Sequence, residues 1–272
     1  MANLLFLTAD ILHVVRALSS EALTAEERAL KGITRRTLKQ LPTWPLWEAG
    51  EHDQLDKFHQ IQLYGKPCFT PKGAIILNSL WNYRVKPNGK RRSRNCCDGS
   101  PRACPALRLF AETYSSCIEQ PISRLFVALA AVMDYNIYGG DAIDAYAHSP
   151  PPSVPTFVRI DDAYSEWFLK RFGITLDRRM VLPVQRALQG HPESGRLWEK
   201  HINLILADPE LGFKPTTHER NIYVATVKGT PVLLSRQVDD FVLACPNAEL
   251  AEYIYPVSYP TLRAHENPEH PV

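Results

Sequence analysis

The stretch Leu233-Leu-Ser-Arg-Gln-Val-Asp-Asp-Phe-Val-Leu-Ala-Cys245 places two adjacent aspartates inside an apolar run. Carboxylates in such surroundings are costly to bury unless a cation meets them. An earlier segment, Gly139-Gly-Asp-Ala-Ile-Asp-Ala-Tyr146, supplies another aspartate at the end of an apolar stretch. Three carboxylates from two strands, Asp141, Asp239 and Asp240, are what a pair of Mg²⁺ ions needs for phosphoryl transfer.

Helix and strand patterns surround these two clusters. The apolar, alanine-rich residues Pro121–Tyr135 predict a buried helix that leads into a strand over Asn136–Ala147. Ser194 is expected to cap a helix that ends at Ile205. The remaining patterns predict strands at Thr156–Ile160, Met180–Val184, Asn221–Thr226, Val232–Ser235 and Phe241–Cys245, and a helix from Asn247 to Tyr255. We expect Asp141 and Asp239 to lie within a few ångströms of each other, at the end of an antiparallel sheet backed by the first two helices.

A further aspartate pair, Asp161-Asp162, has a structural explanation. It precedes a helical pattern over Ala163–Arg171, which Gly173 ends. A carboxylate at the start of a helix satisfies free backbone N–H groups and meets the positive end of the helix dipole. This pair is therefore predicted to be a helix cap and not a metal site.

A basic segment lies between Arg84 and Arg102. It contains seven Arg or Lys and one acidic residue, a local charge of +6 in a chain whose formal net charge is +2. The strand pattern of Ala74–Val85 and the Asn88-Gly89 turn place this segment at the tip and return strand of a β-hairpin. Such a patch is typical of a site for an anionic ligand. The alternative is a solvated hairpin tip that binds no ligand.

Composition argues against several classes of protein. The chain has 272 residues, of which 45% are hydrophobic, enough for one large core or two small ones. Its six cysteines form no C-x-x-C pair, which argues against a zinc site. Without a signal peptide, a disulfide framework is not expected either. Leu4–Leu7 is too short to span a membrane. We expect a cytoplasmic or nuclear protein with reduced cysteines.

The two ends of the chain carry less information. Residues 1–46 are predicted to be a helical linker, in which Thr24–Glu27 begins a helix towards Gln40. Residues 46–66 follow as an amphipathic helix. Residues 257–272 are rich in proline and lack periodicity, which predicts a disordered tail.

Taken in order, these motifs resemble the reverse transcriptases of copia-type (Pseudoviridae) retrotransposons. The likeness is carried by Pro121–Ala131 with Gly140–Tyr146, by Ala187–Trp198, by Leu211–Val224 and by Gln237–Asp240. It covers residues 47–256 and implies an α+β fold with an antiparallel palm sheet backed by helices. The implied fingers region spans about 47–115 and 148–188, the palm region about 116–147 and 189–256, and the thumb is missing.

The resemblance implies an RNA-directed and DNA-directed DNA polymerase, a nucleotidyltransferase that joins a dNTP to the primer 3′-hydroxyl on an RNA or DNA template. It places Asp141, Asp239 and Asp240 as the catalytic metal-site residues: Asp141 and Asp239 would bridge two Mg²⁺ ions, with Mn²⁺ as an alternative ion, and Asp240 would tune that pair. It assigns the substrate contacts to Ala142, Asp144, Tyr146, Gln189, Gly190, Arg92, Arg94 and Val238. Among these, Tyr146 would exclude a 2′-hydroxyl, and the two arginines would grip the triphosphate.

Three departures from the family pattern matter. Gln237 stands where the family usually has Tyr, and Asn95-Cys96-Cys97 replaces hydrophobic residues after Arg94. No thumb or RNase H segment follows Asp240, so we expect a fragment of a longer polyprotein, which an intact element would carry in a virus-like particle. The alternative is a truncated, inactive remnant of the transposable element that at most binds nucleic acid. A metal-dependent nuclease would need a further Glu or His that this spacing lacks.

Overall fold

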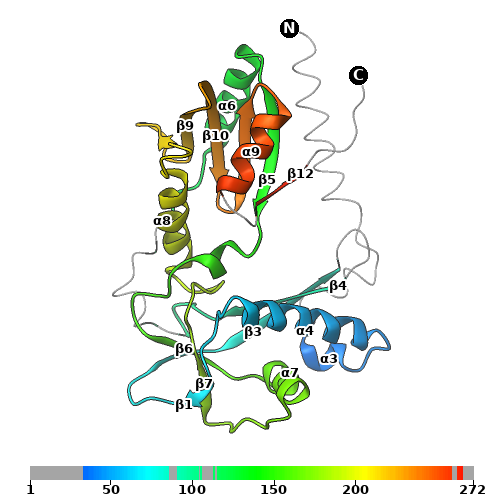
Figure 1. Cartoon of the computed structure of the whole chain (residues 1–272). Helices are drawn as coiled ribbons and strands as arrows, with labels where there is room; N and C mark the ends of the chain where they lie inside the picture. The colour runs from blue at the N-terminus through cyan, green and yellow to red at the C-terminus, as the bar shows by residue number, and fades with distance from the viewer. Residues whose placement is uncertain are drawn as a thin grey trace.

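A computed structural model of the chain describes residues 33–85, 91–103, 105, 113, 115–258 and 262–265. These residues form a mixed α/β structure with three sheets and six α-helices. Figure 1 shows two parts: a six-stranded sheet with its helices above, which we name the large unit, and two smaller sheets with their helices below, which we name the small unit. Within the described residues, no helix has the length and apolar character to cross a membrane.

The large unit is built on an antiparallel sheet. Its strand order is β12-β5-β11-β10-β9-β8. The strands are β5 (Asn136–Ala142), β8 (Lys214–Pro215), β9 (Ile222–Val227), β10 (Thr230–Gln237), β11 (Asp240–Cys245) and β12 (Leu262–His265). In the hairpin of β10 and β11, Gln237 lies opposite Asp240, so Val238 and Asp239 are the two residues of the turn.

Helices cover both faces of this sheet. Along β11, Val242 and Ala244 pack on one side with Phe126 and Ala130 of α6 (Gln120–Val132). The alternate residues pack on the other side with α8 (Ser194–Leu206) and α9 (Ala248–Ser258); they are Phe241, Leu243 and Cys245. This alternation follows from the two-residue period of a strand. Both predicted helices therefore pack on the sheet, but on opposite faces.

The small unit holds the remaining strands and helices. Its four-stranded sheet has the order β1-β7-β6-β2, formed by β1 (Cys68–Phe69), β2 (Ile75–Leu77), β6 (Thr156–Arg159) and β7 (Met180–Pro183). A separate hairpin pairs β3 (Ser79–Val85) with β4 (Arg91–Cys97). The helices are α3 (Arg35–Leu38), α4 (Trp44–Gln60) and α7 (Asp162–Phe172). The 3₁₀ helix η1 (Ala145–His148) begins the passage from β5 of the large unit towards the small unit.

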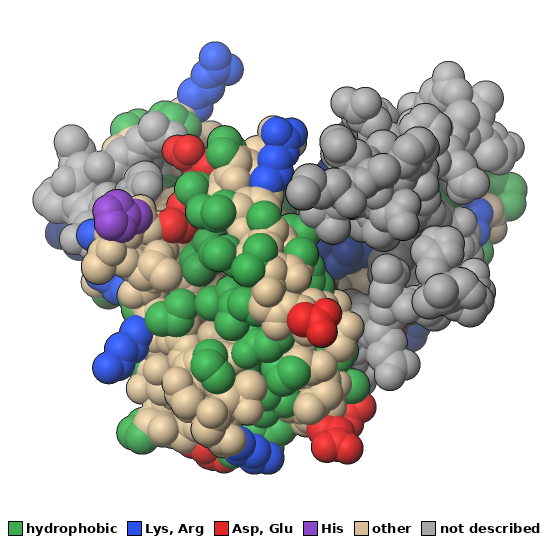
Figure 2. Space-filling model, turned by 90° about the horizontal axis from the view of Figure 1, so that it is seen from above, with side chains coloured by type: hydrophobic (Ala, Val, Ile, Leu, Met, Phe, Trp, Pro, Cys, Tyr) green, Lys and Arg blue, Asp and Glu red, His purple; other side chains and the backbone are tan. Residues whose placement is uncertain are grey.

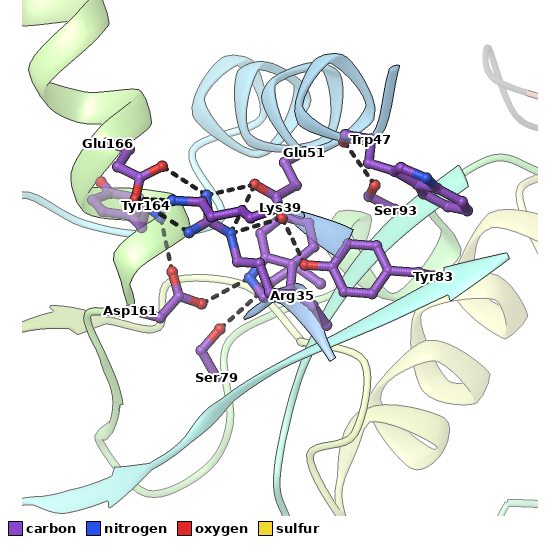
Figure 3. Close-up of polar contacts among 12 residues, drawn as sticks. Arg35, Lys39, Trp47, Glu51, Ser79, Tyr83, Ser93, Asp161, Tyr164 and Glu166 are labelled. Carbon is purple, nitrogen blue, oxygen red and sulfur yellow. Dashed lines mark hydrogen bonds and ion pairs between the residues drawn. The ribbon is translucent and has the colours of Figure 1, made fainter. Parts of the chain in front are cut away.

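A polar network joins the helices of the small unit to its hairpin (Figure 3). Arg35 of α3 donates to both oxygens of Glu51 on α4, at 3.0 Å from Nε and from Nη2. It also pairs with Glu166 of α7, and Tyr83 of β3 donates to Glu51 at 2.6 Å. Glu51 is 1% exposed, and buried carboxylates are stable only with such partners. The network therefore fixes three helices against the hairpin.

Several predicted elements are confirmed. Asp161 caps α7 by accepting a hydrogen bond from the Tyr164 N–H, and Gly173 ends this helix at φ +69°. The pairing of Val85 with Arg91 confirms the basic hairpin, although its predicted Asn88-Gly89 turn lies outside the described residues. The predicted Thr24 start of the N-terminal helix also lies outside them. The prediction that this helix continues unbroken towards Gln40 is wrong, because Thr34 is extended and caps a separate short helix, α3, that begins at Arg35.

Two predictions about the large unit's helices are wrong. The helix expected to be buried over Pro121–Tyr135 exposes Leu125 and Val132, at 51% and 84%. Only one stripe of α6, which contains Phe126 and Ala130, meets the sheet. The face of the molecule in Figure 2 carries a broad band of exposed hydrophobic side chains. Ser194 is not the cap of α8, because Glu193 occupies that position and the Ser194 hydroxyl donates to the Leu188 carbonyl at 2.7 Å.

Two boundaries also differ from the predictions. The strand expected to reach Ala147 ends at Ala142, because Asp144 takes a left-handed conformation (φ +52°) and a 3₁₀ helix follows. The tail predicted to be disordered over 257–272 contains β12, which pairs with β5. An open edge of a sheet can add a strand through backbone hydrogen bonds alone, so side-chain periodicity gave no sign of it.

Candidate functional site

The two acidic clusters meet at one end of the large unit's sheet. Asp141 on β5 lies directly opposite Asp240 on β11. The Ala142 N–H donates to the Asp239 carbonyl at 2.9 Å, which ties the hairpin turn to β5. Burial and the charges of Asp239 and Asp141 raise the pKa of Asp240. The prediction that both segments lie at the end of one antiparallel sheet is confirmed.

A cavity of about 350 Å³ opens beside this sheet end, between the two units. Its volume is within the usual range for small-molecule sites. Eight of the predicted site residues line it: Asp141, Asp239, Ala142, Asp144, Tyr146, Gln189, Arg92 and Arg94. They come from β5, the β10–β11 turn, η1, the loop before α8, and β4. Segments far apart in the sequence thus converge on one space.

Three predicted site residues do not line the cavity: Asp240, Gly190 and Val238. Asp240 is the first residue of β11 and pairs with Asp141, whereas Asp239 belongs to the turn that precedes it. Gly190 has φ +93°, and a Cβ atom there would collide with the carbonyl oxygen of Cys97. Its close backbone contact is with the end of β4. Val238 occupies the turn, where its carbonyl accepts a hydrogen bond from Trp198 at 2.7 Å.

Opposite charges line different parts of the cavity. Arg91, Arg92 and Arg94 approach it from β4, whereas Asp141 and Asp239 approach it from the large unit. Burial and the neighbouring charge of Arg94 lower the pKa of Arg92, and the charges of Asp144 and Asp141 oppose that shift. The carboxylates and guanidinium groups are therefore close enough to interact electrostatically. A ligand that carries both phosphate groups and a cation matches this pattern.

Tyr146 adds an aromatic ring to the same cavity. It belongs to η1, which begins three residues after the end of β5, the strand that carries Asp141. Burial and the charge of Asp239 raise the pKa of its hydroxyl, so the group stays neutral at physiological pH. The ring is partly buried against the large unit's core, which restricts its movement.

One wall of the cavity was not predicted from the sequence. It is formed by a polar stripe of α4 that consists of Gly50, Asp53, Gln54 and Lys57. These residues are three, four and seven positions apart, the spacing of one helix face. The signal was present in the sequence, beside the apolar stripe that buries Trp47, Leu55 and Phe58. Nothing in the local pattern indicated that this polar face would meet a ligand site instead of open solvent.

The acidic side chains beside the cavity are the groups that could hold a metal ion. Among the residues that the structure describes, no group of three or more His, Cys, Asp or Glu side chains forms a ready metal site. Asp141 and Asp239 both line the cavity, at the end of the large unit's sheet where the two acidic clusters meet. Mg²⁺ in nucleotide-binding proteins often takes only one or two carboxylates, with water and substrate phosphates completing its shell. These residues fit an Mg²⁺ ion that arrives with phosphate groups.

No family model matches the chain, and no curated protein is similar enough to match it.

Proposed function

We propose that this chain is the fingers–palm module of a copia-type reverse transcriptase. The large unit would be the palm, and the small unit with its basic hairpin would be the fingers. One observation carries the proposal: two aspartates from adjacent antiparallel strands and three arginines from a distant hairpin line the same cavity. That arrangement suits a nucleoside triphosphate with Mg²⁺ better than it suits a neutral ligand.

Each residue then has a definite task. Asp141 and Asp239 would hold the metal ions, with the Ala142 carbonyl as a further oxygen ligand. Bound Mg²⁺ supplies activation of the primer hydroxyl and neutralisation of the phosphate charge. Arg92 and Arg94 would bind the triphosphate by forked hydrogen bonds. Tyr146 would lie beneath the sugar, and Gln189 would border the nucleotide.

The proposed partners are a primer annealed to an RNA or DNA template, and dNTPs. The second candidate is an inactive remnant that binds nucleic acid without extending it. The observation that favours this alternative is the position of Asp240, which leaves two of the three predicted carboxylates on the cavity. In either case the basic hairpin would contact phosphate groups, so binding alone does not separate the two functions.

The test is extension of a labelled primer on RNA and DNA templates, with dNTPs and either Mg²⁺ or Mn²⁺. We expect metal-dependent extension, and we expect Asp239→Asn to lower its rate at least about 100-fold because a charged metal ligand is lost. Asp162→Asn is the matched control, since Asp162 lies at the start of α7 and outside the cavity. Template binding without extension would favour the remnant. Extension that Asp239→Asn leaves unchanged would contradict the site.

A further inference from the structure

A buried polar network lies behind the β10–β11 turn. Its centre is Arg236, the last buried residue before the turn, which is 0% exposed. The Arg236 Nη2 donates to the Asn221 side-chain oxygen at 2.7 Å, and its Nη1 donates to the Val238 carbonyl at 3.3 Å. Its Nε donates to the Tyr223 hydroxyl at 3.4 Å. A fully buried guanidinium needs this many acceptors, so its place in the sheet is specific.

The positive charge of Arg236 has a buried counterpart on α8. Glu199 lies 4.0 Å from the Arg236 Nη2, and its side chain is 4% exposed. Burial opposes ionisation of Glu199, but hydrogen bonds from Ser116 and Arg196 and the charge of Arg236 lower its pKa. Glu199 is therefore a carboxylate at neutral pH. The pair connects α8 to the strand that leads into the turn.

The turn itself is strained at Val238. Its φ is +58°, a left-handed conformation that is costly for a β-branched residue and needs support from its surroundings. The support comes from two donors on the Val238 carbonyl: the Trp198 indole N–H at 2.7 Å and Arg236 at 3.3 Å. On the other side of the turn, the Ala142 N–H binds the Asp239 carbonyl. Both peptide carbonyls of the turn are thus held by fixed donors.

We propose that Trp198 and Arg236 are positioning residues that hold Val238 in its left-handed conformation and thereby direct the Asp239 carboxylate into the cavity. This inference rests on the proposed function and extends it to residues that touch no substrate. A side chain that carries a metal ligand must be held to a fraction of an ångström to contribute fully to catalysis. A freely moving turn would place Asp239 correctly for only part of the time.

A purely structural role is the competing explanation, because Trp198 is also fully buried in the large unit's core. Trp198→Phe keeps an aromatic ring but removes the indole donor. Trp167→Phe is the matched control, since Trp167 is 3% exposed and donates its indole N–H to Asp56 at 3.0 Å, far from the turn. Arg236→Lys is a second variant that keeps the charge beside Glu199 but loses the forked geometry.

The experiment measures primer extension as kcat and KM for dNTP, and hydrogen–deuterium exchange of the backbone at 237–242. We expect Trp198→Phe to lower kcat about 10-fold or more, with KM changed less than about twofold. We expect Arg236→Lys to act in the same direction. Both variants should speed exchange at the turn, whereas Trp167→Phe should change neither kcat nor exchange there.

Two results would overturn the inference. If Trp198→Phe and Arg236→Lys behave like Trp167→Phe in both measurements, these side chains do not position the turn. If they lower kcat while exchange at the turn stays unchanged, the effect is not positioning. When no chain shows extension that depends on Asp239, the proposed function fails, and the exchange comparison still decides whether the two residues fix the turn.

Discussion

Asp239 and Asp240 are neighbours in the sequence but have different surroundings. Asp239 lines the cavity, and Asp240 pairs with Asp141 across the sheet without lining it. The charges of Asp141 and Asp239, together with burial, raise the pKa of Asp240. Under the proposed function, Asp240 would tune the charge of the other two aspartates, and Asp239 would bind metal directly.

Tyr146 gives a prediction at the scale of one residue. Its ring lines the cavity beside Asp141, where the proposed function places the incoming sugar. Tyr146→Ala removes the ring that would collide with a 2′-hydroxyl, so we expect ribonucleotide use relative to deoxynucleotide use to rise at least about 10-fold. The measurement is kcat/KM for rNTP and dNTP on the same primer.

Tyr146→Phe is the control for that experiment, because it keeps the ring and removes only the hydroxyl. We expect it to preserve discrimination against ribonucleotides. Equal discrimination by the alanine variant and the unmodified chain would show that Tyr146 is an ordinary core aromatic.

At the scale of elements, the small unit depends on a few buried polar contacts as well as on apolar packing. Arg35, Glu51 and Tyr83 connect α3, α4 and β3, and Glu166 adds α7 (Figure 3). Glu51 is buried, whereas the side chain of Glu166 is 42% exposed. The two carboxylates bind the same arginine, but solvent screens only one of them strongly.

We expect Glu51→Ala to lower the free energy of unfolding by about 3 kcal/mol, because the buried Tyr83 hydroxyl and the Arg35 Nε lose their hydrogen-bond partner. Glu166→Ala should cost about 0–1 kcal/mol, as expected for a partly exposed ion pair. Urea unfolding followed by circular dichroism measures both. Similar losses from the two variants would contradict the view that burial decides the strength of this network.

At the scale of the whole molecule, the two units meet at a close backbone contact. The Cys97 N–H at the end of β4 donates to the Gln189 carbonyl at 2.9 Å. A Cβ atom on Gly190 would collide with the Cys97 carbonyl, and one on Gly99 would collide with the Gly190 carbonyl. These contacts fix the basic strand relative to the loop that borders the cavity. The relative position of the arginines and aspartates depends on them.

Gly190→Ala tests this contact. Gly173 is the matched control, because it also has a positive φ but a Cβ atom there would have no neighbouring atom within 4 Å. We expect Gly173→Ala to cost about 1 kcal/mol from backbone strain alone. Gly190→Ala should cost about 3 kcal/mol or more, since the clash adds to the strain. Unfolding measurements compare the two, and equal losses would mean that the units do not depend on this contact.

Much of the local structure could be predicted. The basic hairpin, the cap at Asp161, the strand that carries Asp141 and the return strand from Phe241 follow from periodicity and turn chemistry, which act over a few residues. Two of the wrong predictions concern features that contacts between distant segments determine. The exposure of α6 and the strand β12 depend on which surface a segment meets. The early end of β5 comes instead from the left-handed backbone of Asp144.

The candidate site divides in the same way. The sequence by itself determined the aspartates, the basic segment and the aromatic at Tyr146, because their chemistry is a property of residue type and near neighbours. Only the tertiary structure decided that these groups share one cavity, that the polar face of α4 joins them, and that Asp240 and Gly190 do not. The physical reason is that a cavity is made by the crossing of elements far apart in the chain. Backbone contacts such as that between Gln189 and Cys97 fix those crossings, and no local pattern records them.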